Sequence, residues 1–326
     1  MEPSPRWRPV DKSLGLFASL ADTIAGSERA MRGGMPDFSS ATTLFVLSDY
    51  SGDHRGAGYE VLSFLVFDPR SIGTWHQVWE PARRAYLRDG RRMAFKSLSD
   101  GRRRHAMPAF LHAADQLDGL LLTLSLNRRL PPLFEDGEYP PTVEGLEQLR
   151  LWKRKPYLKM LTAVNIVSVL IAGLSHPGQD IFWYSDEDDL AASPRRLCDL
   201  CNVFARVSSH YLQHSLRHFR FGTSKSDDGS KILEDLLAIP DIAAGSVSDI
   251  FTNYLLDATA PAQTIMTPIP HSTTWKAAGM VPWLADNTMR LKRVVISLEP
   301  TGQGEEKCFR RWTFHAVHQE PVILTP

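Results

Sequence analysis

Short apolar runs that alternate with longer helical patterns constrain the fold of this chain more than any other feature of its sequence. Runs of strand length, rich in apolar and β-branched residues, occupy 42–48, 59–67, 120–126 and 179–184. Residues 102–117 and 143–174 instead carry apolar side chains at helical spacing. Strands that alternate with helices along one chain predict an α/β protein, here with a mixed sheet flanked by helices.

Weaker patterns complete the expected order of elements. Residues 92–98 and 218–221 predict further strands, and residues 190–216 predict a helix. Pro240 has the favoured first-turn position of a helix that runs to about residue 255. Pro156 is expected to break or kink the long helix, because proline lacks the amide hydrogen that a helix interior uses.

Proline and glycine content divides the chain into three expected parts. The proline-rich residues 1–40 are interpreted as an N-terminal arm, and residues 41–258 as the α/β domain. Residues 259–326 form a C-terminal extension that begins rich in proline and threonine. Within it, the runs 291–298 and 308–317 predict a terminal β-hairpin.

The charge balance restricts where a polyanion could bind. Lysine and arginine number 37 and so do aspartate and glutamate, which gives a formal net charge of zero. No global field therefore attracts nucleic acid, and such a site has to be a local basic patch. Candidate patches are Arg83, Arg84, Arg88, Arg91 and Arg92; Arg102, Arg103 and Arg104; and Lys153, Arg154 and Lys155. Solvated side chains beside helices explain each patch equally well.

Cysteine content and hydropathy indicate the compartment. The three cysteines, Cys198, Cys201 and Cys308, are too few for a disulfide framework, and no basic start followed by an apolar run opens the chain. A cytoplasmic protein is the expectation. The longest apolar stretch, 161–174, is interrupted by Asn165 and falls short of the roughly 20 residues of a membrane span, so we interpret it as a buried helix and expect no membrane partner.

Three aspartates lie where apolar elements end or begin. Asp49 follows the first strand, Asp186 follows a later strand, and Asp241 lies in the first turn expected for the last helix. Mg²⁺ and Mn²⁺ bind hard oxygen ligands, and a two-metal phosphoryl-transfer site collects carboxylates from separate elements. The pattern predicts that these three carboxylates converge on a shared metal-binding cleft.

An ordered set of short motifs resembles a bacterial domain-of-unknown-function family, number thirty-eight hundred. Ser48-Asp49-Tyr50-Ser51-Gly52-Asp53 resembles its Asp-Glu-Ser-Gly opening. The later matches are Phe95-Lys96-Ser97, Tyr184-Ser185-Asp186-Glu187, Thr223-Ser224-Lys225 and Asp241-Ile242-Ala243-Ala244-Gly245. The resemblance covers roughly residues 42–256. It implies an RNase H-like fold, which agrees with the expected order of three strands, helix, strand and helix.

The resemblance also implies an activity, that of a nuclease dependent on Mg²⁺ or Mn²⁺ in a bacterial defence or mobile-element setting. The implied metal ligands are Asp49, Asp186 and Asp241. Tyr50 and Ala94 stand where the family has carboxylates, and Asp53, Asp100 or Glu187 could compensate for them. The implied catalytic lysine is Lys225, and the implied nucleic-acid contacts are Lys96, Arg102, Arg103, Arg104 and Ser224. DNA and RNA are both open as substrates.

Each of these motifs has a structural alternative. Asp49 could belong to a hairpin turn, and Asp186 and Asp241 could cap helices or favour their dipoles. Residues 233–238 fit the closing motif almost as well as the segment from Asp241, which we prefer because Gly245 completes the pattern only there. The alternative for the whole protein is a non-catalytic RNase H-like module with a protein-interaction or regulatory role, and a protein partner or homo-oligomer is open. A third alternative is a transferase or hydrolase that acts on small phosphates. Trp75 and Trp79 could stack on bases but are more often core residues.

Overall fold

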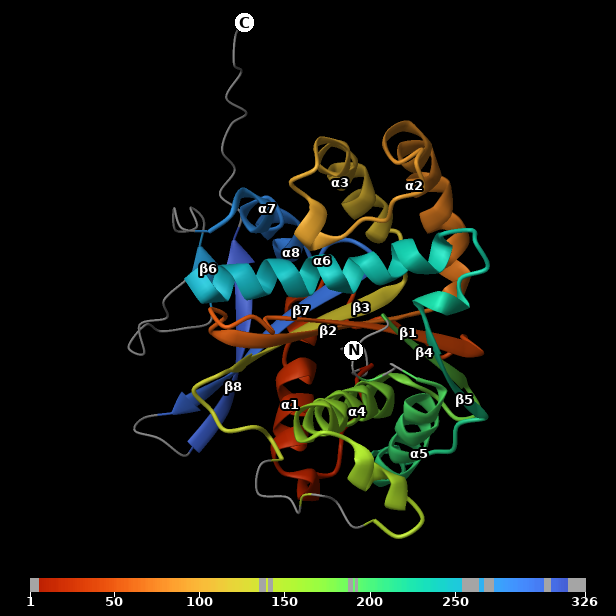
Figure 1. Ribbon diagram of the computed structural model, residues 1–326, viewed down its shortest axis with the longest axis vertical. Helices are drawn as coiled ribbons and strands as arrows, with labels where there is room; N and C mark the ends of the chain where they lie inside the picture. Colours follow the sequence, from red (N-terminus) through yellow and green to blue (C-terminus); the bar gives the residue numbers. More distant parts are fainter. Residues whose placement is uncertain are drawn as a thin grey trace, which may run out of the picture.

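The computed structural model describes residues 6–134, 139, 143–186, 190, 193–253, 264–266, 273–301 and 306–315. Within these residues, eight strands form one mixed sheet in the order β5-β4-β1-β2-β3-β7-β8-β6 (Figure 1). The strands are β1 Thr43–Ser51, β2 Tyr59–Phe67, β3 Gly119–Asn127, β4 Asp180–Ser185, β5 His218–Thr223, β6 Thr264–Met266, β7 Leu291–Thr301 and β8 Glu306–His315. The helices are α1 Leu16–Ala25, α2 Ile72–Tyr86, α3 Gly101–Ala114, α4 Arg154–Leu174, α5 Pro194–Tyr211, α6 Ile232–Asn253, α7 Trp275–Ala278 and α8 Val281–Ala285. The predicted α/β class, with a mixed sheet flanked by helices, is confirmed.

Strand directions divide the sheet into antiparallel and parallel parts. β1, β2 and β3 pair antiparallel in chain order. β4 pairs parallel with β1, and β5 pairs parallel with β4. In the β1–β4 pair, Ser48 lies opposite Ser185, which is the last residue of β4. The carboxyl ends of β1 and β4 therefore meet at the same edge of the sheet.

Helices cover both faces of the sheet (Figure 1). Alternation along β1 sends Leu44 and Val46 to a core shared with α1, α4 and α5, and Leu47 to a core shared with α2, α3 and α6. Because the period of a strand is two residues, Asp49 points to the same face as Leu47. That is the face along which α6 runs.

The predicted strand at 92–98 is wrong. This segment joins α2 to α3 and contains a short 3₁₀ turn, Phe95–Ser97. Its apolar residues are buried, Met93 at 1% exposure, but its backbone groups bind side chains instead of a neighbouring strand. The amide of Phe95 donates to Asp241, and the carbonyl of Arg92 accepts from Arg103. The third antiparallel strand is β3.

Two helix starts also differ from expectation. α6 begins at Ile232, so Pro240 lies inside the helix instead of opening it. α4 begins at Arg154, which places Pro156 in the first turn, where its missing amide hydrogen breaks no helical bond. The expected helical region 143–174 is thus broken just before Pro156: a separate 3₁₀ turn covers Glu147–Leu151, and α4 starts after it.

Segments at both ends of the chain pack against the central sheet. Leu20 and Ile24 of α1 are fully buried in the core that also contains α4. β7 pairs parallel with β3 and antiparallel with β8, so the predicted terminal hairpin forms and extends the sheet. Among the described residues, α4 is the one helix long and apolar enough to cross a membrane, and it is mostly buried inside the protein. This burial agrees with its interpretation as a core helix.

A buried hydrogen bond between β1 and β4 provides a test of this packing. Trp183 and Ser48 are fully buried, and the indole Nε1 donates to Ser48 Oγ at 2.8 Å. Trp183→Phe removes this donor and leaves a cavity, which should lower the free energy of unfolding by about 1–3 kcal/mol. Urea denaturation measures the change. Trp275→Phe is the matched control because Trp275 is 42% exposed, and equal stabilities of the two variants would contradict the described packing.

Candidate functional site

A pocket of about 270 Å³ opens where the carboxyl ends of β1 and β4 face α6. Asp49, Asp186 and Asp241 all line it, together with Lys96 and Arg92 from the segment between α2 and α3. The three aspartates come from three separate elements and are distant in sequence. The fold thus brings together the three carboxylates that the sequence analysis singled out.

Strand register explains the placement of two of them. Asp49 and Asp186 each lie one residue beyond the paired residues Ser48 and Ser185 on neighbouring parallel strands. Side chains alternate between the faces of a sheet, so both aspartates project to the face covered by α6. Tyr50 points to the other face, where its ring packs under the ammonium group of Lys159 at 4.2 Å. Its hydroxyl is hydrogen-bonded to Ser48 Oγ at 3.1 Å.

The third carboxylate comes from α6. Leu237, Asp241 and Gly245 recur every four residues and all line the pocket, as one face of a helix does. Asp241 retains some exposed surface, but protein encloses its carboxyl group, and this desolvation raises the pKa of Asp241 above its ordinary value. The Phe95 amide, which donates to Oδ2 at 2.8 Å, and the charges of Arg92 and Lys96 act in the opposite direction.

Asp186 is held from two sides. Its Oδ2 accepts from the guanidinium of Arg92 at 3.0 Å, and its Oδ1 accepts from Ser224 Oγ at 2.8 Å. The negative charge of Asp186 also contributes to the raised pKa of Asp241. The two carboxylates are therefore electrostatic neighbours, and Arg92 offsets part of their repulsion.

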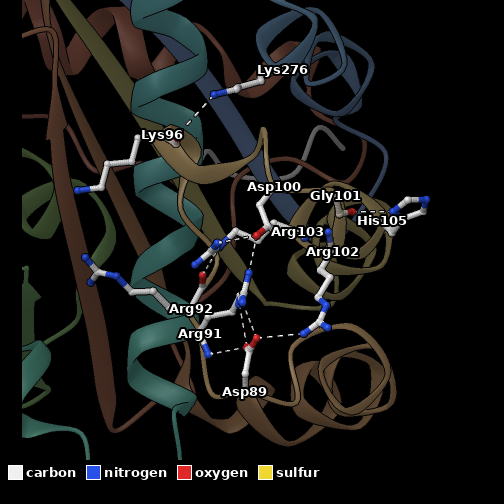
Figure 2. A network of polar contacts seen from close by, with 10 residues as sticks. All are labelled: Asp89, Arg91, Arg92, Lys96, Asp100, Gly101, Arg102, Arg103, His105 and Lys276. Atoms are coloured by element: carbon white, nitrogen blue, oxygen red, sulfur yellow. Dashed lines mark hydrogen bonds and ion pairs between the residues drawn. The ribbon is translucent and has the colours of Figure 1, made fainter.

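The segment that carries Arg92 is braced by a network of ion pairs. Figure 2 shows Asp89 and Asp100 between the guanidinium groups of Arg91, Arg102 and Arg103. Arg103 also donates from Nε to the carbonyl of Arg92 at 2.8 Å. Several charges that hold one loop in one conformation form a stronger brace than isolated surface pairs. The network fixes the backbone from which Arg92 reaches Asp186.

The other predicted site residues lie in different places. Asp53 is 65% exposed and pairs with Lys155, and it does not line the pocket. Lys225 lies on the same short turn as Ser224 without lining the pocket. Arg104 stacks on the ring of Trp275 at 4.7 Å, outside the pocket. Glu187 lies outside the described residues.

Two charged residues that line the pocket, Arg92 and Glu234, were not predicted from the sequence. Arg92 was noted only as one member of an arginine-rich stretch, and nothing in the sequence shows which arginine reaches the aspartates. Glu234 lies on α6 about two turns before Asp241, on the same face of the helix. This spacing did not indicate a shared site because the helix was expected to begin at Pro240. The competing segment 233–238 places Asp235 elsewhere, where it accepts from Arg83 and Trp79.

The site has carboxylate oxygens of the kind that Mg²⁺ and Mn²⁺ prefer. In the part of the chain that the structure describes, however, no three His, Cys, Asp or Glu side chains form a group that could hold a metal ion. The ion pair between Arg92 and Asp186 occupies one of the three carboxylates. A divalent cation would therefore have to replace Arg92 at Asp186.

No protein-family model matches the chain, and no curated protein sequence matches it. Assignment to family thirty-eight hundred accordingly stays a prediction from the motifs.

Gly245 provides a test of how the pocket is built. A Cβ at this position would lie 2.8 Å from Phe95 Cβ and still closer to the Phe95 ring. Gly245→Ala should therefore displace the segment that bonds to Asp241 and lower the free energy of unfolding by about 1–3 kcal/mol, since overpacking outweighs the better helix propensity of alanine. In Gly73→Ala, a helical control with open space at its Cβ, stability should stay equal or increase. Calorimetric unfolding distinguishes the two, and a stabilised Gly245→Ala variant would show that Phe95 does not pack there.

Proposed function

We propose that this protein is a divalent-metal-dependent phosphodiesterase acting on nucleic acid, built on an RNase H-like domain. The observation that carries the proposal is the convergence of Asp49, Asp186 and Asp241 from three elements on one pocket. Convergent carboxylates from separate elements are what a metal-assisted phosphoryl-transfer site requires.

The topology supports the proposal. Strands β1, β2 and β3 are antiparallel, and β4 and β5 follow as parallel strands on the other side of β1. A helix precedes each parallel strand, and α6 follows the last. This order agrees with the RNase H-like arrangement that the motif resemblance implies. Helices α2 and α3 are then an insertion between β2 and β3, and the segment between them carries Arg92 and Lys96.

The electrostatics of the pocket give a reason for a cation to bind. Four carboxylate residues, Asp49, Asp186, Asp241 and Glu234, line one pocket, and the repulsion between Asp186 and Asp241 contributes to the raised pKa of Asp241. Bound Mg²⁺ or Mn²⁺ would supply Lewis-acid and water-activating chemistry for hydrolysis of a phosphodiester. Asp49, Asp186 and Asp241 would hold the ions.

The basic residues of the pocket would act on the substrate. Lys96 is exposed at the rim, and Arg92 lies beside Asp186. Both could offset negative charge on a phosphate that enters the pocket. A guanidinium released from Asp186 would present paired donors to phosphate oxygens, a geometry that favours arginine over lysine.

A second candidate function is a non-catalytic protein-interaction module on the same scaffold. Two observations favour it. Asp186 forms an ion pair with Arg92. Tyr50 stands where the resembled family has a carboxylate, and its side chain lies on the face of the sheet opposite the pocket, against Lys159. A site that uses its aspartates only for internal ion pairs has no need of metal.

Cleavage assays test the two functions against each other. Labelled single- and double-stranded DNA and RNA are incubated with the protein in Mg²⁺ or Mn²⁺, and we expect metal-dependent cutting. Asp49→Asn and Asp241→Asn should each lower the rate on the order of 100-fold or more, because each removes a charged metal ligand. Asp53→Asn, a carboxylate outside the pocket, is the control and should keep full activity. Absence of cutting together with absence of metal binding by calorimetry would leave the interaction module as the better account.

The Arg92 ion pair predicts an effect on metal affinity. Arg92→Gln removes the charge that competes for Asp186, so Mn²⁺ should bind about two- to fivefold more tightly, as expected for a partly exposed ion pair. Isothermal titration with Mn²⁺ measures this, and Arg84→Gln, which loses an exposed ion pair with Glu80 outside the pocket and outside the network around Arg92, should leave the affinity unchanged. Weaker Mn²⁺ binding by Arg92→Gln would mean that Arg92 supports the metal site instead of competing with it.

A further inference from the structure

A second pocket, of about 230 Å³, lies far along the sheet from the acidic pocket and shares no lining residue with it. Its walls come from three parts of the chain: the segment after α1, the end of α8 with the turn that follows it, and the adjoining ends of β7 and β8. The lining residues outside the strands are Ser27, Ala30, Met31, Arg32, Leu284, Ala285, Asn287 and Thr288. Nothing in the proposed phosphodiesterase activity uses it.

The pocket exists because two strands separate. The pairing of β7 with β8 stops at Val295 and Trp312. Beyond that point β8 pairs with β6, through Thr313 and Phe314. β7 instead continues toward residues 284–288, where Asn287 Oδ1 accepts from the Arg293 amide at 2.8 Å. The wedge between the diverging strands is lined by both polar and aromatic side chains.

Three arginines line this pocket, and no described residue of its lining is acidic. Arg293 is buried, stacks on Trp283 at 4.3 Å and is ion-paired with Asp115, yet its Nε has no hydrogen-bond partner among the described residues. Arg311 is positioned by the carbonyl of Gly26 at 2.6 Å. No described carboxylate forms an ion pair with Arg32 or Arg311, which leaves two positive charges at the pocket uncompensated in this part of the chain.

We propose that this pocket binds a small phosphate-bearing anion. The strand register places Arg311 on the face of the sheet that carries α1, where it reaches Gly26, and Arg293 on the opposite face, beside Trp283. The wedge between the strands thus has guanidinium groups on both sides, and charge-assisted hydrogen bonds from arginine are well suited to phosphate oxygens. Thr288 also lines the pocket, with its hydroxyl donating to Asp286 Oδ1 at 2.6 Å, and Ser27 is a buried residue of the lining. Trp312 and Phe314, which belong to the core on the face of the sheet that carries Arg293, form an apolar part of the lining.

The position of the pocket suggests what binding does to the fold. The pocket lies between the segment after α1 and the ends of β7 and β8. Few polar contacts connect these three parts of the chain, and one of them is the hydrogen bond from Arg311 to the Gly26 carbonyl. An anion held between their arginines would tie these segments together. A ligand that binds the native state alone raises the free energy of unfolding by RT ln(1 + [L]/Kd).

Isothermal titration with inorganic phosphate and with ribose 5-phosphate tests the proposal on the full chain. We expect saturable binding of at least one of them, weakened about tenfold or more in Arg32→Gln and in Arg311→Gln, since each loses a charge-assisted hydrogen bond. Arg129→Gln, an exposed arginine outside both pockets, is the matched control and should bind as the wild type does. Arg32 is exposed, so its variant keeps the test valid even if Arg311→Gln fails to fold.

Two results would overturn the proposal. One is the absence of binding of either probe to the wild type. The other is equal weakening in Arg129→Gln, which would indicate non-specific attraction to basic surface. Asp49→Asn should leave the binding unchanged, because the acidic pocket is separate, and a loss of binding in this variant would count against an independent site. These outcomes do not depend on whether the protein cleaves nucleic acid.

Discussion

The parallel pairing of β1 with β4 is the constraint on which the acidic pocket depends. It sets Ser48 opposite Ser185, so the next residue of each strand is an aspartate on the same face and at the same edge of the sheet. A shift of the register by one residue would send one aspartate to the opposite face, against α4. The buried bond from Trp183 to Ser48 and the contact from Ser185 Oγ to the Ser48 carbonyl at 3.3 Å hold this register immediately below the aspartates.

Collecting carboxylates at one place is unfavourable unless opposite charge or hydrogen-bond donors accompany them. The segment between α2 and α3 provides both. It offers the guanidinium of Arg92 to Asp186, the amide of Phe95 to Asp241 and the ammonium of Lys96 to the rim. The absence of a side chain at Gly245 allows the Phe95 ring to approach α6 closely enough for this arrangement. The aspartates at the strand ends and on α6 therefore interact directly with the segment between α2 and α3. These contacts compensate the carboxylates and also hold the segment in place.

Local patterns predicted the parts of the fold that depend on local physics. The four apolar runs became β1, β2, β3 and β4 because buried strands require continuous apolar sequence. Asp49 and Asp186 could be placed from the positions where two of those runs end. The strand expected at 92–98 failed for a tertiary reason: Met93 is buried as a strand residue would be, but the backbone beside it bonds to Asp241 and Arg103. The contact between Arg92 and Asp186 joins residues 94 positions apart, and no local pattern indicates it.

The short outer strand β5 has a consequence for how the molecule behaves in solution. It is the first strand in the sheet order, so one side of its backbone has no strand partner among the described residues. Such an edge is a template on which another chain can add a strand. β5 has only six residues, His218 and Arg220 among them, with His218 beside Asp180 and Arg220 over the ring of Phe182. Short length and polar or charged side chains oppose pairing with the edge of another molecule. The exposed edge of the sheet therefore lies only one strand from β4 and the acidic pocket without being a strong site of aggregation.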